Sequence, residues 1–254
     1  MRIVSFNLNG IRAAVNKGLF EWLEKDNPDV FCVQETKAQP EQIDLLTFQS
    51  LGYSHSIICS AQKKGYSGVA VFSKTKPDFH TVGIKHPMFD SEGRVIRADF
   101  GDLTVVCVYI PSGTTGDVRQ AIKMDFLKVF TTYLLSLRKE RPNLVICGDY
   151  NICHKAIDIN HPERHQKTSG FLPEEREWFD RFMEHGFVDS FREFNKEPKQ
   201  YSWWSYRADA REKNLGWRID YHIVTQELMN RLKHAEIQPD IRFSDHSPVV
   251  LEID

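Results

Sequence analysis

The sequence has few cysteines, no long apolar run and almost no net charge. Its 254 residues include five cysteines, an odd number, and no two of them form a Cys-x-x-Cys pair, which excludes a disulfide scaffold and a zinc ribbon. No apolar stretch approaches the roughly 20 residues that a membrane-spanning helix needs. The first residues show no basic-then-apolar leader, so we expect reduced core thiols in a cytoplasmic protein.

The charge balance and the missing motifs narrow the chemistry further. Lys and Arg number 33 against 35 Asp and Glu, and the pI is about 6.6. A dedicated electrostatic DNA-binding protein is usually far more basic, although binding depends on where the cations cluster. There is no Gly-x-Ser-x-Gly elbow, no Walker A loop and no Gly-x-Gly-x-x-Gly turn after a strand. Serine-nucleophile and nucleotide-loop chemistry therefore has little support.

What the sequence does have is a globular composition, with 41% hydrophobic and 27% charged residues. A chain of this length buries roughly three quarters of its unfolded surface, so one large core is affordable. No linker-like stretch divides the chain, and we expect a single domain over residues 1–254. Short β-branched strands alternate with a few amphipathic helices. This α/β pattern favours sheets packed face to face with helices outside.

The boundaries of these elements follow from hydrophobic periodicity and from Gly, Pro, Asp and Asn breaks. The clearest helix is Asp117–Leu137, where apolar residues recur at helical spacing. Shorter helices are predicted at Gly18–Asp26, Pro40–Leu46, Pro173–His185 and Gln226–Leu232. Strands are predicted at Arg2–Asn7, Val30–Gln34, Ser54–Ile58, Val69–Ser73, Val95–Phe100, Leu103–Ile110, Leu144–Gly148, Trp217–Val224 and Pro248–Ile253.

A faint internal duplication relates the two halves. In the first half, the strand Ile3–Asn7 is followed by a helix and then by Pro28–Glu35. In the second, Val105–Tyr109 is followed by a helix and then by Pro142–Asp149. Each copy ends a buried strand abruptly in a polar or acidic residue. Two such halves would form a two-sheet sandwich whose strand ends converge at one rim.

Five polar residues lie at or just beyond the carboxyl ends of apolar strands: Asn7, Glu35, Tyr109, Asp149 and Asn151. Any one of them alone is better explained as the point where a strand leaves the core. Together they are harder to explain in that way, because clustered carboxylates and carboxamides contribute poorly to stability. Such a cluster suits a hard divalent cation, which takes oxygen ligands.

The C-terminal segments add an acidic strand residue and a histidine. Asp220 lies within a predicted strand, where an unpaired carboxylate is costly. Asp245 and His246 stand side by side just before the last strand. An Asp that orients a His fixes its tautomer and raises its basicity. For His246 taken alone, a capped turn histidine is the simpler interpretation.

A basic and aromatic stretch runs over Tyr201–Arg207 and is followed by Arg211, Lys213, Trp217 and Arg218. It fits stacking on or exclusion of a nucleotide together with pairing to phosphates. A core-facing aromatic strand with solvated charges fits equally well. The turn Lys63–Gly68 is glycine-rich and basic, so its backbone could approach a phosphate, although an ordinary surface hairpin looks the same.

Seven ordered blocks carry a family resemblance that spans essentially the whole chain. They are Phe6–Ala13, Gln34–Lys37, Gly65–Ala70, Tyr109–Pro111, Gly148–Asn151, Gly216–Tyr221 and Ser244–Pro248. In this order they resemble exodeoxyribonuclease III and the apurinic/apyrimidinic endonucleases of the same family. The resemblance implies the four-layered α/β sandwich shared with DNase I, in which two packed mixed β-sheets are flanked by helices. It also implies Mg2+-dependent phosphodiester hydrolysis on damaged DNA, with Mn2+ as a substitute ion.

The resemblance also implies a ligand set for the metal. Glu35 would be the principal ligand, with Asn7 and Asp245 nearby or binding through water. Asp149 and Asn151 would complete the acidic and amide surroundings of the ion. Oxygen ligands of this kind suit Mg2+, which retains several water molecules.

Catalytic roles follow from the same resemblance. Asp149 would act as general base on the attacking water, and Asn151 would orient that water and steady the phosphate. His246, held by Asp220, would donate to the phosphate, and Tyr109 would bind the phosphate or help the leaving oxygen. The division of acid and base roles among Tyr109, Asp149 and His246 stays open.

Substrate contacts come from the same matched blocks. Trp203, Trp217 and Ile219 match a pocket that accepts an abasic sugar and is too tight for an intact nucleotide. The remaining matched DNA contacts are Arg12, Lys17, Tyr66 and Arg207, the last at a position where the human-type enzyme inserts a Met. Two departures stand beside them: Ser112 replaces an Asn or Gln of many relatives, and Thr115 replaces a DNA-inserting Arg. These two changes put the balance of endonuclease against exonuclease in doubt.

The function predicted from the sequence is therefore a DNA-repair nuclease that cuts 5′ to abasic sites and trims 3′ ends as a 3′-to-5′ exonuclease. Its expected partner is duplex DNA with abasic sites or damaged 3′ ends, and no membrane association is expected. The protein would act as a monomer in a bacterial-type cytoplasm with access to the nucleoid. One alternative is a phosphoesterase of the same fold acting on a lipid or inositol phosphate. A second is a DNA-binding module that has lost turnover.

Overall fold

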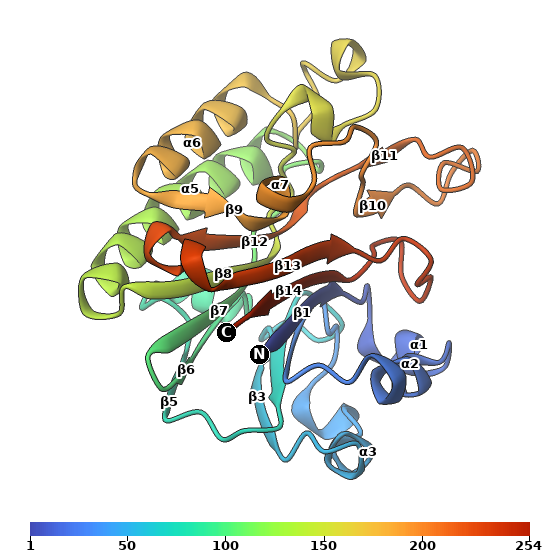
Figure 1. The fold of residues 1–254 in the computed structure, drawn as a ribbon. Coiled ribbons are helices and arrows are strands. Elements are labelled where there is room, and N and C mark those ends of the chain that lie inside the picture. The colour runs from blue at the N-terminus through green and yellow to red at the C-terminus, as the bar shows by residue number, and fades with distance from the viewer.

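Two six-stranded mixed sheets pack face to face in the computed structural model, which describes residues 1–254 (Figure 1). The first sheet has the order β13 (Leu232–Ile237), β14 (Val249–Ile253), β1 (Arg2–Asn7), β2 (Val30–Gln34), β4 (Val69–Ser73) and β3 (His55–Cys59). The second sheet has the order β5 (Phe79–Val82), β6 (Val95–Phe100), β7 (Leu103–Tyr109), β8 (Asn143–Asp149), β12 (Asp220–Thr225) and β9 (Phe187–Asp189).

Each sheet is built around one parallel pair of strands. β1 runs parallel to β2 with Asn7 opposite Gln34, and β7 runs parallel to β8 with Tyr109 opposite Asp149. The other pairings in both sheets are antiparallel. The two parallel pairs are the two halves of the predicted duplication. Because the carboxyl ends of parallel strands meet at one edge of a sheet, each pair delivers its polar terminal residues to one rim.

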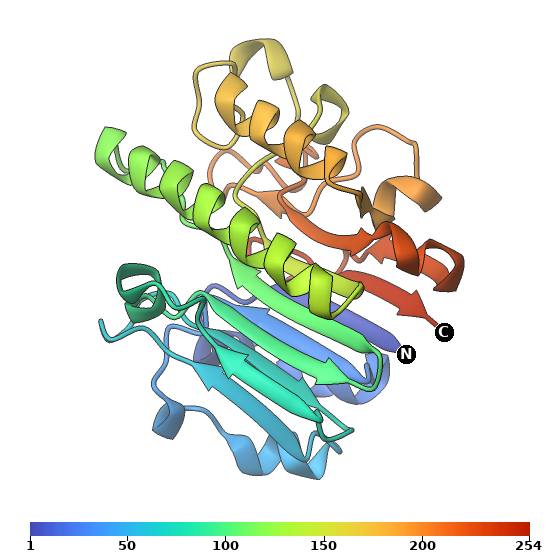
Figure 2. The same ribbon diagram turned by 90° about the vertical axis from the view of Figure 1, so that its left-hand side faces the viewer.

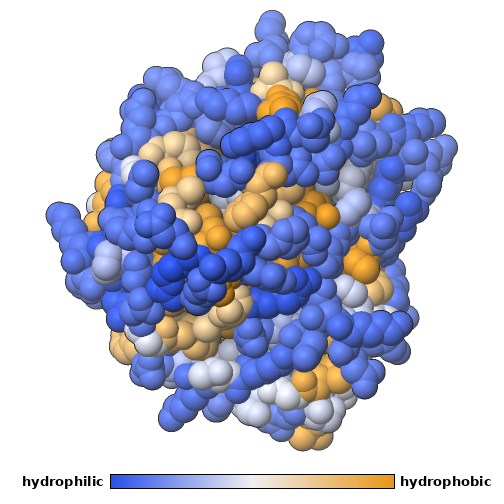
Figure 3. Space-filling model, in the orientation of Figure 1, coloured by the Kyte–Doolittle hydropathy of each residue, from blue (hydrophilic) through white to orange (hydrophobic).

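Apolar side chains of both sheets meet in a central buried layer that includes Ile3, Cys32, Val105 and Val145. All five cysteines are buried and unpaired. The central strands β1, β2, β4, β7 and β8 are buried along almost their whole length, as expected where both faces of a sheet are covered. On the face shown in Figure 3, hydrophilic residues predominate and hydrophobic ones form separate patches.

Helices cover the outer face of each sheet and complete four layers. The long helix α5 (Asp117–Glu140) and α6 (Pro173–Glu184) lie along the outer face of the second sheet, as Figure 2 shows. α2 (Leu19–Asp26) and α3 (Leu45–Ser50) cover the first sheet. The short helices are α1 (Ile11–Val15), α4 (Pro87–Ser91) and α7 (Ser190–Phe194). The predicted four-layered α/β sandwich is confirmed. None of these helices combines the length and apolar character needed to cross a bilayer.

Most predicted elements are confirmed to within a few residues, and α5 extends three residues beyond the predicted end at Leu137. Two helix predictions were wrong in detail. The predicted helix Pro40–Leu46 is a 3-10 turn, Pro40–Gln42, followed by α3, because Asp44 caps the new helix by accepting a hydrogen bond from the Thr47 backbone. The predicted helix at Gln226–Leu232 is a 3-10 segment, Gln226–Arg231. Two further 3-10 turns lie at Ala156–Asp158 and Pro162–Arg164.

The predicted strand Trp217–Val224 was also wrong, because it is two elements. β11 (Gly216–Trp217) pairs with β10 (Trp203–Trp204) in a separate two-stranded sheet, and only β12 joins the second sheet. Between them the Arg218 amide donates to the carbonyl of Asp158 and the Ile219 amide donates to the Ser202 hydroxyl. These bonds replace the ladder and redirect the chain.

Candidate active site

The rim where the parallel strands end brings together the predicted polar residues. Asn7 is the last residue of β1, Tyr109 of β7 and Asp149 of β8, while Glu35 directly follows β2. Asp220 opens β12 directly opposite Asp149 in the antiparallel register. The two halves of the sandwich therefore supply one shared site.

Local backbone geometry turns the residues beyond the strands into this site. Glu35 and Asn151 adopt left-handed φ values of 52° and 53°. Gly148, at φ 147°, has no room for a side chain, because a Cβ there would lie 1.8 Å from the carbonyl oxygen of Val108. The glycine thus lets β8 pass close to β7 just before Asp149.

Hydrogen bonds from two asparagines hold the carboxylates of Glu35 and Asp149. The Asn7 side-chain amide donates to Glu35 Oε1 and to Asp149 Oδ2, each at 2.9 Å. The Asn151 backbone amide donates to Asp149 Oδ1 at 2.8 Å, and the Asn151 side chain donates to Asp149 Oδ2 at 3.3 Å and to the Ile110 carbonyl at 3.0 Å. Asp149 is consequently fixed in orientation by two asparagines.

The histidine and its aspartate form the other half of the site. His246 Nδ1 lies 2.9 Å from Asp220 Oδ2, and His246 Nε2 lies 3.9 Å from Asp149 Oδ2. Asp220 Oδ2 also accepts a hydrogen bond from Ser202 at 2.7 Å. The imidazole is therefore held by one carboxylate and directed toward a second.

Burial and charge act together on the ionisation of this group. Burial, then the charge of Asp220, raises the pKa of Asp149 to about 7. Burial opposes the imidazolium form, but Asp220 and Asp149 outweigh it and raise the pKa of His246 to about 10. Burial also opposes the ionisation of Glu35, yet the neighbouring Lys37 ammonium, 2.8 Å away, lowers the pKa of that carboxyl. Burial raises the pKa of the Tyr109 hydroxyl well above its ordinary value.

These residues fit a hard divalent cation. Glu35 and Asp149 each present a carboxylate oxygen, and these oxygens lie within 4.8 Å of each other and of a ring nitrogen of His246. The raised pKa of Asp149 shows that the buried negative charge lacks full compensation, which a cation would supply. Asn7 directs its amide hydrogens at the carboxylates, and its oxygen accepts from the Asn9 backbone. Asp245 accepts hydrogen bonds from the Trp203 indole and the Asn9 side chain, both at 3.0 Å.

A cavity of about 300 Å3 opens directly beside this group. Trp203, Trp217 and Ile219 all line it. The two tryptophan rings meet edge to face with centroids 6.0 Å apart, and both pack against a buried cluster that includes Ile219, Cys153 and Phe171. The cavity wall contains all three predicted pocket residues together with the following: Glu35, Tyr109, Ser112, Thr114, Asp149, Asn151, Thr168, Ser169, Gly170, Asp245 and His246.

The aromatic stretch divides between two roles, and the adjacent β10 residues Trp203 and Trp204 have different surroundings, as expected where side chains alternate across a strand. Trp203 lines the cavity, whereas Tyr201 and Trp204 pack against Ala210 in a small buried cluster. The nucleotide-contacting and core-facing interpretations of this stretch therefore each hold for part of it.

The other four predicted DNA-contacting residues lie outside the cavity. Arg12, on α1, and Arg207 have exposed side chains. Lys17 is exposed and donates to the carbonyl of Phe243 at 3.0 Å. Tyr66 is half-buried, and its hydroxyl accepts from Arg94. None of these four side chains lines the cavity or joins the cluster of Glu35, Asp149, Asp220 and His246.

One arginine behind Tyr109 was missed from the sequence. Arg94, which is 2% exposed, places its guanidinium 4.8 Å from the centre of the Tyr109 ring and donates to the Tyr109 carbonyl at 2.9 Å. Glu92 accepts from its Nε at 2.6 Å. Nothing in the segment marks this role, because Arg94 directly precedes β6, a strand that itself carries the charged residues Arg97 and Asp99.

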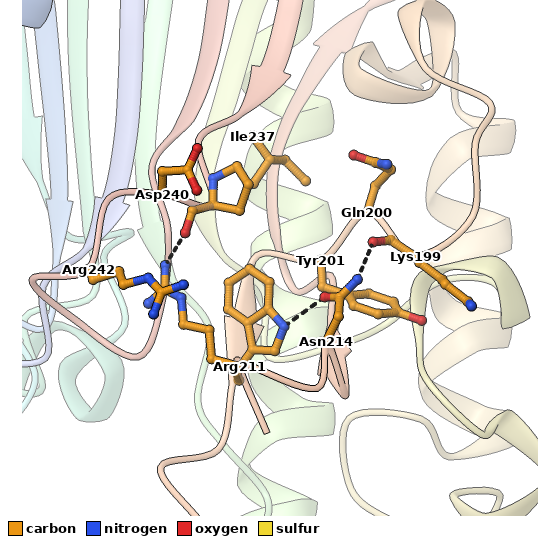
Figure 4. A pocket seen from close by; sticks show the side chains of 10 residues that line it. Lys199, Gln200, Tyr201, Arg211, Asn214, Ile237, Asp240 and Arg242 are labelled. Carbon is orange, nitrogen blue, oxygen red and sulfur yellow. Dashed lines mark hydrogen bonds between the residues drawn. The ribbon is translucent and has the colours of Figure 1, made fainter. Parts of the chain in front are cut away.

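Arg211, which the sequence placed in the basic stretch expected to pair with phosphates, instead supports the segment that carries Asp245 and His246. Arg211 lies 4.6 Å from the Trp204 ring centre and donates to the carbonyls of Pro239, Ile241 and Ser244 and to the Ser247 hydroxyl. These bonds lie beside a second cavity, lined also by Lys199, Asn214 and Arg242 (Figure 4). The terminal nitrogens of Arg211 all donate to backbone and hydroxyl oxygens of the protein. Arg211 therefore holds the segment in place and has no terminal nitrogen left to bind a phosphate.

A four-layered sandwich whose strand ends hold buried carboxylates, an asparagine pair and a His–Asp pair defines a phosphoesterase of the endonuclease and phosphatase type. The model of the Endonuclease/Exonuclease/phosphatase family matches residues 4–246, and the chain belongs to this family.

Relatives within the family match this chain over almost its whole length. An exodeoxyribonuclease of Bacillus subtilis is 43% identical over 255 residues, covering 100% of this chain and 99% of the relative. The DNA repair nuclease APEX1 of Danio rerio is 40% identical, covering 99% of this chain and 81% of the relative. Among solved structures, an AP endonuclease from Archaeoglobus fulgidus superposes with a TM-score of 0.91 at 29% identity, covering 100% of this chain and 99% of that chain.

Proposed function

We propose that this protein is a Mg2+-dependent DNA-repair nuclease that hydrolyses the phosphodiester 5′ to an abasic site in duplex DNA and also trims 3′ ends. The single observation that carries the proposal is the shared cavity, in which Trp203, Trp217 and Ile219 adjoin Asp149 and His246. Relatives named as an exodeoxyribonuclease and a DNA repair nuclease support the substrate class. A neighbour described as a 3′ phosphatase from Neisseria bound to product DNA supports trimming at 3′ ends (TM-score 0.92, 28% identity).

A divalent cation completes the charge of the site. When bound, Mg2+ would neutralise the phosphate and favour an ionised attacking water. Glu35 and Asp149 are the carboxylates placed to hold it, with Asn7, Asn151 and Asp245 as the further ligands in the proposal. Mn2+, which also accepts oxygen ligands, is the proposed substitute.

Asp149 is the proposed general base. Burial raises its pKa to about 7, and a bound cation would lower that pKa again, so Asp149 would be a carboxylate at neutral pH and could accept a proton from the attacking water. Asn7 and Asn151 hold both of its oxygens, so its orientation is set before substrate arrives. Asn151 would also orient the attacking water, which would donate to its side-chain oxygen.

His246 and Tyr109 are the proposed donors to the phosphate. His246 is held at Nδ1 by Asp220, which leaves Nε2 as the donor on the cavity side. With a pKa of about 10, the imidazolium carries a positive charge toward the site where negative charge develops. Tyr109 keeps its proton because its pKa is well above the ordinary value, so it can bind the phosphate or protonate the leaving oxygen.

The cavity walls supply the proposed selectivity. A nucleotide that lacks its base is cheaper to extrude from the duplex because less stacking is lost. The edge-to-face rings of Trp203 and Trp217 form the apolar part of a wall that is otherwise mostly polar, and such a wall would suit a bare sugar. The exposed side chains of Arg12, Lys17 and Arg207 and the half-buried Tyr66 lie outside this cavity, where contacts to the DNA backbone would be made.

The proposal extends to the whole chain and its setting. Residues 1–254 would form one catalytic domain that works as a monomer on duplex DNA. Its buried free cysteines suit a reducing cytoplasm.

Cleavage of a labelled duplex carrying one stable abasic analogue tests this function, with Mg2+ and with excess chelator. We expect one cut 5′ to the analogue that disappears with chelator. Shortening from the 3′ end without that cut would replace the proposal by a mainly exonucleolytic enzyme. No cleavage of either kind would overturn the nuclease and leave a phosphoesterase of another substrate.

A further inference from the structure

An ion pair lies completely buried behind the active site, between α5 and α6. Lys123 Nζ and Glu175 Oε1 are 2.5 Å apart, and both side chains have no exposed surface. Burying two charges is expensive, and apolar residues of similar size often serve stability equally well. The pair therefore calls for an explanation in its other contacts.

The lysine reaches the backbone of Asn151. Its ammonium donates to the Asn151 carbonyl at 2.8 Å. Asn151 has a left-handed backbone, while its amide and side chain are bound to Asp149 and Ile110. With Lys123 at the carbonyl, every polar group of Asn151 except its side-chain oxygen has a partner within the protein. That oxygen is left for a ligand in the cavity.

The glutamate fixes the opposite wall of the same cavity. Glu175 Oε2 accepts from the backbone amides of Gly170 at 2.6 Å and Leu172 at 3.0 Å. Oε1 is shared among Lys123, the side-chain amide of Gln120 at 3.0 Å and the Ser169 hydroxyl at 3.4 Å. One carboxylate thus binds five donors and holds the 169–172 segment in place.

Gly170 shows how tightly this wall is positioned. A Cβ there would lie 2.9 Å from the Trp217 ring and 3.1 Å from the Asn151 carbonyl. Gly170 consequently sits between the sugar pocket and the very carbonyl that Lys123 holds. A small movement of either partner of the ion pair would displace both.

We infer that Lys123 and Glu175 are a positioning pair, which fixes Asn151 relative to the cavity wall formed by Gly170 and Trp217. The pair thereby determines both the hydrolysis rate and the preference for an abasic sugar. This inference rests on the proposed function. Neither residue lines the cavity or touches the reacting atoms. Apolar replacements would fill the space but would leave the Asn151 carbonyl and the Gly170 and Leu172 amides unpaired.

The test compares Glu175→Gln, Lys123→Met and the charge-free double variant with wild type. Because a displacement of about 1 Å at a reacting group can cost on the order of 100-fold, we expect kcat at the abasic analogue to fall about tenfold or more in each. KM should stay within about twofold, since no DNA contact is removed. The ratio of abasic-site cleavage to 3′ trimming of intact duplex should fall as well.

Asp99→Asn is the matched control. Asp99 is also buried and pairs with Arg97 and Thr104, but near the amino end of β7, away from Tyr109 and the rim. Urea unfolding of each variant shows how much stability is lost. We expect the control to lose stability and keep its kcat and its cleavage ratio.

Kinetics are corrected for the folded fraction, and binding of abasic and intact duplex is compared in chelator. A fall in kcat and in the ratio of abasic-site cleavage to 3′ trimming, greater than in the control at equal stability and with binding nearly unchanged, supports the inference. Wild-type kcat and preference in the folded variants would overturn it and leave a purely structural pair. Should Lys123→Met not fold, Glu175→Gln and the double variant decide. Failure of wild type to cut at all would overturn the proposed function instead.

Discussion

His222 makes a prediction about acid stability that is independent of the active site. Its side chain is completely buried in β12, and neither ring nitrogen has a hydrogen-bond partner. Burial alone lowers the pKa of His222 to about 3 from an ordinary value of 6.5. The folded protein therefore keeps this imidazole neutral in a range where the unfolded chain protonates it.

The sign and size of the effect follow from proton linkage. Between pH 6.5 and pH 3 the unfolded state binds one more proton at His222, so stability falls as the pH falls through this window. Each pH unit well inside the window costs about 1.4 kcal/mol, which amounts to about 3 kcal/mol at pH 4.5. No cost arises above pH 6.5, where both states are neutral at this position.

His222→Leu removes the titrating group and both unpartnered nitrogens. We expect the variant to equal or exceed the wild-type stability at pH 7.5, because an apolar side chain needs no hydrogen bond. Its advantage should grow by about 3 kcal/mol between pH 7.5 and pH 4.5. Urea unfolding followed by tryptophan fluorescence at four pH values measures this, with His80→Gln, an exposed change on β5, as the control. Parallel pH profiles for wild type and His222→Leu would refute the reasoning.

Three further predictions concern the site. Asp149→Asn should reduce cleavage at the abasic analogue by about 100-fold or more through loss of the base, while DNA binding persists; quenched kinetics and a binding titration check both. Asp220→Asn should lower the pKa of His246, which is held up by that carboxylate, and NMR titration of the imidazole would show it; an unchanged pKa would contradict the assigned pairing. Arg211→Met should lower kcat by loosening the Asp245–His246 segment, and limited proteolysis should cut residues 239–247 faster than in wild type.

Much of this site could be predicted because its residues follow directly from strand patterns. Asn7, Tyr109 and Asp149 end apolar strands, and two parallel pairs must place such ends at the same rim. The family resemblance implied that Asp220 holds His246, and the structure places the two side chains 2.9 Å apart. The local sequence pattern was sufficient to predict a site residue wherever the role of that residue depends on its position at the end of its own strand.

The supporting residues could not be found in that way. Lys123 occupies a helix that periodicity identifies, yet a lysine there reads as solvent-facing, and only the distant Glu175 explains its burial. Arg211 looks like one more charge in a basic stretch, because its four acceptors lie 28 to 36 residues away. The edge strand β13 was missed because exposed polar residues such as Lys233 and His234 hide its alternation.

The most direct test of the central claim, that one cavity combines hydrolysis with selection of a bare sugar, is a selectivity ratio. It is the single-turnover rate at an abasic analogue divided by the rate at an intact nucleotide in the same duplex with Mg2+, for wild type and for Trp217→Ala. The account predicts a strong preference for the abasic analogue in wild type and a clearly smaller one in the variant, because the opened wall admits a base. An equal ratio in the two proteins would contradict it.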